Sequence, residues 1–406
     1  MPDFLEYIQS PISPQIIHEV LEADFLYYKS LDPPLKQRFI QRVSIFTREK
    51  KFVTRQGLQM NHKVRIIISA CAIQVTFGLD SFLLENFEYV VVYPDIYESP
   101  MTKKMHKGET NLNGFICLSW KHIIEGIENP NDNYNLGIHE WTHALRFNGI
   151  NFQETDYFFD GYINKWVAAA MTEYNNLRTG AKKSIFRRYG ATNIHEFLSV
   201  CTEHFFESPD EFKREAPEFF EQMCILLNQE PSKTGSAHLG VRYALLNTTS
   251  KSLTNQNPIL TFEASFFRTV INFGIRLLYL AMAIITLVLT QNPIAFLFLA
   301  IVLLMAVVKM NNMYFTIKFY DDYVYVQKGF ATYFASQLSI PYRSLMKMEI
   351  FDGNFDNYSI GTVFQFNYFD GSRFAKKVAY CSAIDVPRQQ VMDVLGKKKV
   401  TILWPL

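Results

Sequence analysis

The sequence predicts an α+β protein with a mainly helical N-terminal domain, a two-helix transmembrane hairpin and a small antiparallel β domain with a C-terminal helix. Three stretches of the 406-residue chain lead to this fold class. Apolar residues follow helical spacing in residues 131–229, charges almost vanish from 269–308, and polar and apolar residues alternate from 314 to 383. The predicted boundaries are 1–230 for the helical domain, 231–264 for a linker, 265–310 for the hairpin and 311–406 for the β domain.

The composition excludes some classes of protein. Hydrophobic residues make up 49% of the chain, which is enough for a sizeable core. Lys and Arg number 40 against 39 Asp and Glu, so the chain lacks the basic excess expected of a protein that binds nucleic acid directly. The five cysteines form no CxxC pair, which suits a reducing compartment. Residues 1–20 lack the features of a signal peptide, so we expect the first domain not to be exported.

The N-terminal domain is expected to mix helices with a few strands. The β-branched and aromatic run Phe87–Tyr93, ended by Pro94, predicts a strand. Asn193 followed by Glu196 is typical of a capping box at the start of a helix. The predicted helices are Leu35–Phe46, Lys63–Phe77, Tyr134–Phe147, Gly161–Leu177 and Ile194–Phe206.

Two apolar runs predict the membrane hairpin. Thr269–Thr290 contains one charge, Arg276, and Pro293–Val308 contains none, whereas a bilayer span needs about 20 apolar residues. A helical hairpin buried in a soluble protein is the alternative. Basic residues flank both outer ends and none lies in the turn, so the positive-inside rule places both ends in the cytoplasm. We therefore expect a multi-pass protein of the inner (plasma) membrane, in contact with the lipid bilayer, whose soluble domains face the cytoplasm.

Residues 311–406 are expected to form a small antiparallel sheet or barrel capped by one helix. Asp352-Gly353 and Asp370-Gly371 indicate turns between strands. The predicted strands are Tyr314–Tyr320, Tyr323–Gln327, Met346–Phe351, Val363–Tyr368 and Phe374–Tyr380, and the helix is Val386–Leu395.

Residues 139–143, HEWTH, form an HExxH motif inside one of the predicted helices. Residues four apart share a helix face, so His139 and His143 can bind one Zn²⁺ ion, and Glu140 is placed to take a proton from water as general base. A catalytic zinc site has three protein ligands, and no third histidine follows closely, so a carboxylate from a later helix is required. Glu196, Glu203 and Glu207 all qualify, and the residues themselves do not separate them.

Residues Phe46–Gln229 resemble the Mlc titration factor A family of zinc-dependent, gluzincin-type peptidases. The resemblance is carried by Val92-Tyr93-Pro94, by Gly114 with Leu118-Ser119-Trp120, by HEWTH with Asn148-Gly149, and by RYGATNIHEFLSVCTEHFFESPDEF at residues 188–212. It implies a zincin-like fold and a Zn²⁺ cofactor. It also implies that Glu203, which stands before an aromatic triplet, is the third ligand.

The chain departs from the family pattern around the second histidine. Trp141-Thr142 replace a small residue and alanine, and Arg146 replaces an acid that could orient an imidazole. Tyr189 and His195 are candidates for stabilising an oxyanion or for supporting the ligands. Asp156 and Asp160 are weaker candidates for supporting roles, and we expect His106 to be a solvated loop residue.

Residues 310–406 loosely resemble bacterial PH-like domains, chiefly through Ile340–Phe351. These observations together predict a membrane-anchored zinc metallopeptidase that hydrolyses a peptide or protein substrate. One alternative is a regulatory protein that holds a transcriptional repressor, suggested by the family name, or another partner at the membrane. A third possibility is that the PH-like region is the functional module and the peptidase domain its scaffold.

Overall fold

The computed structural model divides the chain into two compact units, Met1–Leu245 and Leu246–Leu406. Each unit has its own core. The structure describes residues 11–148, 157–247, 257–263, 281, 284–285, 315–328, 336–354, 360–369, 374–381, 388–396 and 401–403.

The first unit contains a four-stranded sheet in the order β1-β2-β6-β5. Strands β1 (Lys51–Thr54), β2 (Tyr89–Tyr93) and β6 (Phe115–Ser119) run parallel, and β5 (Gly108–Asn111) pairs antiparallel with β6 at the edge. The predicted strand at residues 87–93 is thus confirmed as β2, whose three central valines are buried. A small hairpin, β3 (Tyr97–Glu98) and β4 (Met105–His106), precedes the edge strand.

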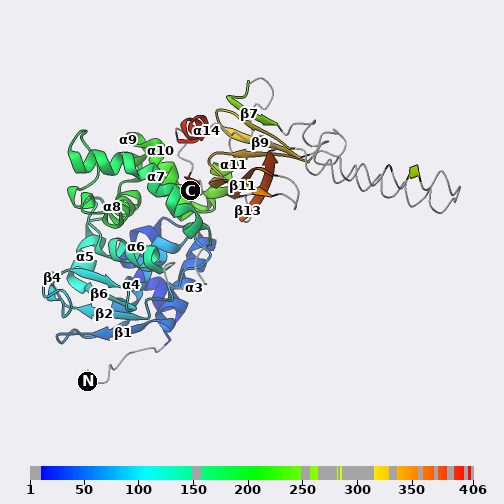
Figure 1. Ribbon diagram of the computed structural model, residues 1–406. Helices are drawn as coiled ribbons and strands as arrows, with labels where there is room; N and C mark the ends of the chain where they lie inside the picture. The colour runs from blue at the N-terminus through cyan, green and yellow to red at the C-terminus, as the bar shows by residue number, and fades with distance from the viewer. Residues whose placement is uncertain are drawn as a thin grey trace, which may run out of the picture. The chain divides into compact units, whose positions relative to one another are not determined.

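Helices make up most of the first unit (Figure 1). The central one, α4 (His62–Thr76), is buried from Val64 to its end, which explains why its sequence is apolar around the whole circumference. The helices before α6 are α1 (Pro14–Asp24), α2 (Leu26–Lys29), α3 (Pro33–Glu49), α4 and α5 (Trp120–Glu128). From α6 onward they are α6 (Leu136–Asn148), α7 (Tyr157–Thr179), the short η1 (Arg188–Ala191), α8 (Ile194–Glu207), α9 (Pro209–Glu215) and α10 (Pro217–Leu227).

Helix α6 lies between α4, α8 and the edge strand β5. The predicted apolar face of this helix is confirmed, because Ile138, Trp141 and Leu145 are buried. The Trp141 ring meets Phe46 of α3 edge-on, with 5.3 Å between the ring centroids. The face that carries the two histidines is therefore turned toward α8 and β5.

Part of the segment that has the composition of a linker is folded. Gln229 and Leu239 form a β-bridge, followed by α11 (Val241–Asn247), with η2 (Gly235–His238) between the bridged residues. The His238 side chain is 3% exposed and lies 3.0 Å from the Tyr27 hydroxyl. Residues up to Leu245 thus belong to the first unit.

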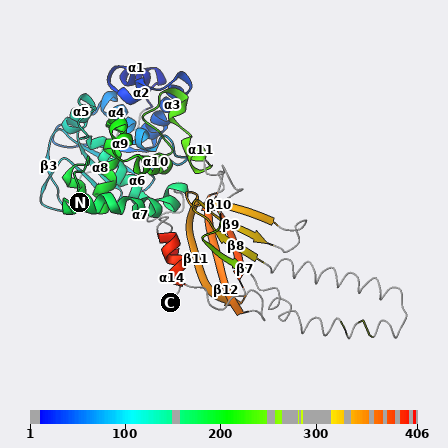
Figure 2. The ribbon, with the colours of Figure 1, turned by 90° about the horizontal axis from the view of Figure 1, so that it is seen from above.

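The second unit is built on two four-stranded sheets, in the orders β10-β9-β8-β7 and β13-β12-β11-β14 (Figure 2). Buried side chains from both sheets and from α14 form one core. All the strand pairs are antiparallel except β11–β14. The elements are β7 (Leu260–Glu263), β8 (Phe315–Phe319), β9 (Tyr323–Lys328), β10 (Ser336–Pro341), β11 (Leu345–Asn354), β12 (Ile360–Phe369), β13 (Phe374–Cys381), α14 (Arg388–Gly396) and β14 (Thr401–Leu403).

The prediction of a transmembrane hairpin has to be corrected. Within the described ranges, no helix is both long and apolar enough to cross a membrane. The longest of these helices, α7, has 23 residues but carries charges such as Lys165 and Glu173, whereas a span needs about 20 mostly apolar residues. Most of residues 265–310, to which the hairpin was assigned, lie outside the described residues. The fold class is therefore α+β without the hairpin, and the predicted inner-membrane location is withdrawn with it.

Close packing between α4 and α6 gives a stability prediction. A Cβ atom on Gly137 would lie 2.6 Å from Cys71 Sγ, so Gly137→Ala should lower the free energy of unfolding by about 1–3 kcal/mol, as overpacking usually does. Adding Cys71→Ala should recover part of the loss. Thermal unfolding of the wild type and both variants measures this. Equal stability of Gly137→Ala and the wild type would contradict the close contact.

Candidate metal centre

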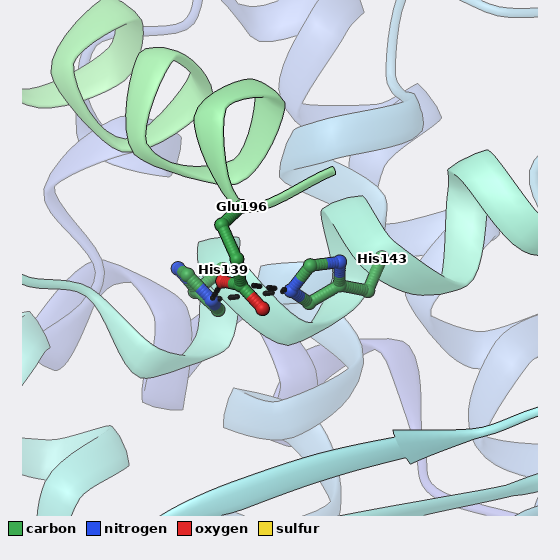
Figure 3. Close-up of side chains that lie close together, drawn as sticks. All are labelled: His139, His143 and Glu196. Carbon is green, nitrogen blue, oxygen red and sulfur yellow. Dashed lines mark hydrogen bonds and ion pairs between the residues drawn. The ribbon is translucent and has the colours of Figure 1, made fainter. Parts of the chain in front are cut away.

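Two helices bring together three side chains that could hold a metal ion (Figure 3). His139 and His143 come from α6, and Glu196 comes from the first turn of α8. Glu196 Oε2 lies 3.0 Å from His139 Nε2 and 3.4 Å from His143 Nε2, and the two nitrogens are 3.2 Å apart. Zinc bonds of about 2.0–2.1 Å at tetrahedral angles would separate ligand atoms by about 3.3 Å. The three atoms therefore fit a single ion.

Glu203 lies on the opposite edge of the His139 ring. Its Oε1 accepts a hydrogen bond from His139 Nδ1 at 2.7 Å and another from Arg187 Nη2 at 2.5 Å. Its Oε2 accepts from the backbone N–H of Asn135 at 2.8 Å. The carboxylate that the family resemblance implied as a ligand thus contacts the nitrogen of His139 that faces away from Glu196.

The charges around His139 are arranged to hold a cation. Burial disfavours the imidazolium, but hydrogen bonds to Glu196 and Glu203 outweigh it and raise the pKa of His139 to about 10. Burial also acts against the charged form of Glu196, yet hydrogen bonds from His139 and His143 hold its pKa well below the usual range. The site therefore attracts positive charge, which a proton or a metal ion can supply.

The start of α6 is fixed by Asn135. Its side-chain oxygen accepts from the Ile138 N–H at 3.1 Å, and its Nδ2 donates to Glu207 Oε1 at 2.9 Å and to Gly126 O at 3.2 Å. One residue thereby ties the start of α6 to α5 and α8, which sets the position of His139 one turn later.

Glu140 is positioned by the edge strand β5. The Thr110 hydroxyl lies 2.7 Å from Glu140 Oε2 and 3.0 Å from its backbone oxygen. A Cβ atom on Gly108 would come within 2.6 Å of Glu140 Oε1, so the glycine leaves the room that the carboxylate occupies. Sequence reasoning missed both residues, because nothing in the local pattern of GETN points to a helix 30 residues later.

The predicted capping box is half correct. The Asn193 side chain accepts from the N–H groups of His195 and Glu196 at the start of α8. The Glu196 carboxylate, however, turns to the two histidines instead of returning to the Asn193 backbone. Asn193 therefore places the N-terminal turn of α8, and with it Glu196, beside α6.

Cavities of about 280 and 650 Å³ open at the cluster, and His139, Glu140, Tyr189 and His106 line both. Tyr189 is half exposed, with its ring centroid 5.9 Å from that of His139, and burial, followed by the charges of Glu196 and Glu140, raises its pKa to about 12. His195 lines the smaller cavity, and burial and the charge of Arg146 lower its pKa.

The remaining candidates are less informative. His106, expected in a solvated loop, belongs to β4 and contacts the Thr102 hydroxyl at 2.7 Å. Asp156 and the side chain of Asp160 lie outside the described residues.

Glu207 is buried away from the cluster. Burial raises its pKa to about 7, while the hydrogen bond from Asn135 opposes the shift and the charges of Glu203 and Asp132 add to it. Glu207 does not make the contacts with His139 and His143 that Glu196 makes.

The fold and the site define a class of protein in which an HExxH helix and a carboxylate from a later helix form a metal-type cluster. Residues 6–226, more than half of the chain, match the family Glucose-regulated metallo-peptidase M90, and the chain belongs to this family. The expected kinship with a metallopeptidase family is thus confirmed.

Similar proteins include several that carry the name Mlc titration factor A. The one from Klebsiella pneumoniae is 24% identical over 220 residues, which cover 50% of this chain and 82% of the relative. The one from Salmonella arizonae is 25% identical over 238 residues, covering 52% and 93%. The Synechocystis protein slr2042 is 24% identical over 248 residues, covering 56% and 88%.

The raised pKa of Glu207 predicts how stability depends on pH. The carboxyl titrates near 4.5 in the unfolded chain and at about 7 in the folded one, so the folded state holds the extra proton and stability falls as the pH rises through that window. Glu207→Gln should remove this loss and stabilise the protein by on the order of 1–3 kcal/mol at about pH 8. Near pH 4 the substitution should have little effect.

Chemical unfolding at the two pH values measures the difference. Glu218→Gln, at an exposed position in the first turn of α10, is the matched control and should change neither value. A Glu207→Gln effect that is the same at both pH values would show that the carboxyl is not buried in its protonated form.

Proposed function

We propose that the protein is a zinc-dependent metallopeptidase. The observation that carries this proposal is the convergence of His139 Nε2, His143 Nε2 and Glu196 Oε2, at separations of 3.0 to 3.4 Å, beside Glu140. Two neutral nitrogens and one carboxylate oxygen are a ligand set that catalytic zinc uses, with a fourth position left for water or substrate.

We assign the third ligand to Glu196 instead of Glu203. Glu203 Oε1 and Oε2 are already engaged by His139 Nδ1, Arg187 and the Asn135 backbone. A hydrogen bond to Nδ1 directs the lone pair of a metal-binding histidine to Nε2 and increases its basicity. Glu203 therefore serves as the residue that orients His139, and Arg187 as the residue that keeps Glu203 in place.

Glu140 is proposed as the general base. A zinc ion held by the three side chains would supply a Lewis acid that acidifies water and polarises a carbonyl group. Glu140 takes the proton of the attacking water, and the Thr110 hydroxyl holds its carboxylate on the side of the open cavity. Tyr189, which lines the same cavity, is placed to donate a hydrogen bond to the oxyanion that forms from the carbonyl.

The substrate is proposed to be an extended peptide. Among the described strands, β5 is the edge of its sheet and pairs only with β6, and it reaches Glu140 through Gly108 and Thr110. An exposed strand edge offers backbone donors and acceptors to a peptide that adds to the sheet. This edge would align a peptide bond along the cleft, next to the general base.

A regulatory function is the second candidate. It is favoured by relatives whose names describe titration of Mlc. On this hypothesis the first unit binds a transcriptional repressor, and the metal cluster contributes to the shape of the binding surface. The two functions are separable, because only hydrolysis requires Glu140.

Glu140→Gln should abolish peptide hydrolysis by the full chain, because the amide cannot accept the proton of water. Zinc content should stay at about one per chain, because Glu140 is not one of the proposed ligands. Hydrolysis of a fluorogenic peptide library and metal analysis of the same samples test both. Wild-type activity in the variant would refute Glu140 as base, and an inactive wild type with bound zinc would favour the regulatory function.

The ligand assignment predicts a difference between two isosteric variants. Glu196→Gln should lose most of the zinc, because it removes a ligand. Glu203→Gln should weaken zinc binding by about 10–100-fold, the usual cost of losing a supporting residue. Competition with a zinc chelator measures both affinities. A larger loss in Glu203→Gln would restore Glu203 as the ligand.

A further inference from the structure

The two cavities at the cluster follow one another along helix α6. On α6, the residues that line the larger cavity start at Asn135 and end at Glu140, whereas those that line the smaller one start at His139 and end at Phe147. His139 and Glu140 line both. The two cavities therefore meet at the proposed metal ligand and the proposed base.

Two other elements show the same order. On β5, Gly108 lines both cavities, Lys107 before it lines only the larger one, and Thr110 after it lines only the smaller one. On α8, Glu203 lines the larger cavity and Glu196 the smaller one. Three elements thus agree that the cavities extend in opposite directions from the cluster. Together they form one groove that passes across the cluster.

The groove has room for chain on both sides of the cluster. The stretch of α6 from Asn135 to Phe147 is about 18 Å long. An extended peptide advances about 3.3 Å per residue, so about five residues match this length. The cavities measure about 280 and 650 Å³. Since about 150 Å³ can hold benzene, each cavity accommodates at least one large side chain.

The charged groups beside the cluster are already engaged. An enzyme that removes terminal residues needs a charged group there to pair with the end of the chain. Glu196 contacts both histidines, and Glu203 pairs with Arg187 and His139. Among the described residues that line both cavities, Glu140 is the only acid and none is Lys or Arg. The junction thus offers the proposed base but no further charge for a chain terminus.

Glu109 also lines the smaller cavity, but its side chain belongs to the other face of β5. Neighbouring residues of a strand point to opposite faces, so Glu109 is turned away from Gly108 and Thr110. Its register partner on β6 is Cys117, and burial, followed by the charge of Glu109, raises the pKa of that thiol to about 12. The Glu109 carboxylate is therefore not directed at the junction of the cavities.

We propose that, given the metallopeptidase function on which this inference rests, the protein cleaves internal bonds of a peptide chain that passes through both cavities. Water adds across the bond at the junction. Its oxygen joins the carbonyl carbon, the C–N bond breaks, and the proton taken by Glu140 passes to the leaving nitrogen. Residues on both sides of the cleaved bond supply binding energy that lowers the barrier.

The test compares peptides of about eight residues, which exceed the length of the groove, with free ends and with both ends blocked by acetyl and amide groups. The zinc-loaded, full-length protein is used, and mass spectrometry of the products locates the cleaved bond. We expect cleavage between internal residues at equal rates for both kinds of peptide. Amino-acid 4-nitroanilides should react at least about 100-fold more slowly, because they lack the remote residues. Glu140→Gln should cleave none of these substrates.

Release of single residues from the free-ended peptides, with the blocked peptides intact, would overturn this inference and leave the metallopeptidase function standing. No cleavage of either kind by the zinc-bound protein would overturn both. The two failures are therefore distinguishable.

Met105 tests the larger cavity separately, because it lines that cavity alone and is 60% exposed. Met105→Ala should lower kcat/KM for the blocked peptides by about tenfold, as loss of an apolar contact with a substrate does. Met101→Ala is the matched control: Met101 is 62% exposed, lies in the turn between β3 and β4, and lines neither cavity. An equal kcat/KM in Met105→Ala and the wild type would show that the chain does not pass through the larger cavity.

Discussion

The buried carboxylate of Glu203 is the group on which the proposed metal centre depends. It is 1% exposed and accepts hydrogen bonds from a side chain of α6, the backbone at the start of α6, and Arg187 next to η1. An uncompensated charge at this depth would be strongly destabilising, and these three hydrogen-bond donors compensate it. The same contacts leave Nε2 of His139 directed at the cavity. The Glu203 side chain therefore both accepts the buried hydrogen bonds and contacts the His139 ring on the side away from Glu196.

One face of α8 supplies three carboxylates with different environments. Glu196, Glu203 and Glu207 are spaced by seven and then four residues, which keeps them on one side of a helix. The first lies at the histidine pair, the second behind His139, and the third is buried beside Asn135. Their partners differ, and so their pKa values differ: that of Glu196 is lowered and that of Glu207 is raised. The surroundings of each carboxylate therefore depend on its position along α8.

The shared helical face of these three glutamates explains part of what the sequence could and could not predict. HEWTH, the apolar face of α6 and the strand at β2 are local patterns, and the structure has them where they were expected. The three glutamates share one helical face, so periodicity cannot say which of them reaches the histidines. Glu196 was further disguised because its spacing from Asn193 matches a capping box. The hairpin was inferred from apolar composition, which is common to membrane spans and to buried helices.

The position of Glu140 shows why such sites need a complete fold. HExxH places a glutamate next to the first histidine, but the helix alone leaves its side chain free to rotate. Strand β5 restricts that freedom, because the Thr110 hydroxyl hydrogen-bonds the carboxylate and Gly108, which has no side chain, leaves the space that the carboxylate then occupies. Alternation along a strand puts residues 108 and 110 on the same face, so both act on one carboxylate. Antiparallel pairing with β6 fixes the register of β5, and the sheet thereby determines where the Glu140 carboxylate points.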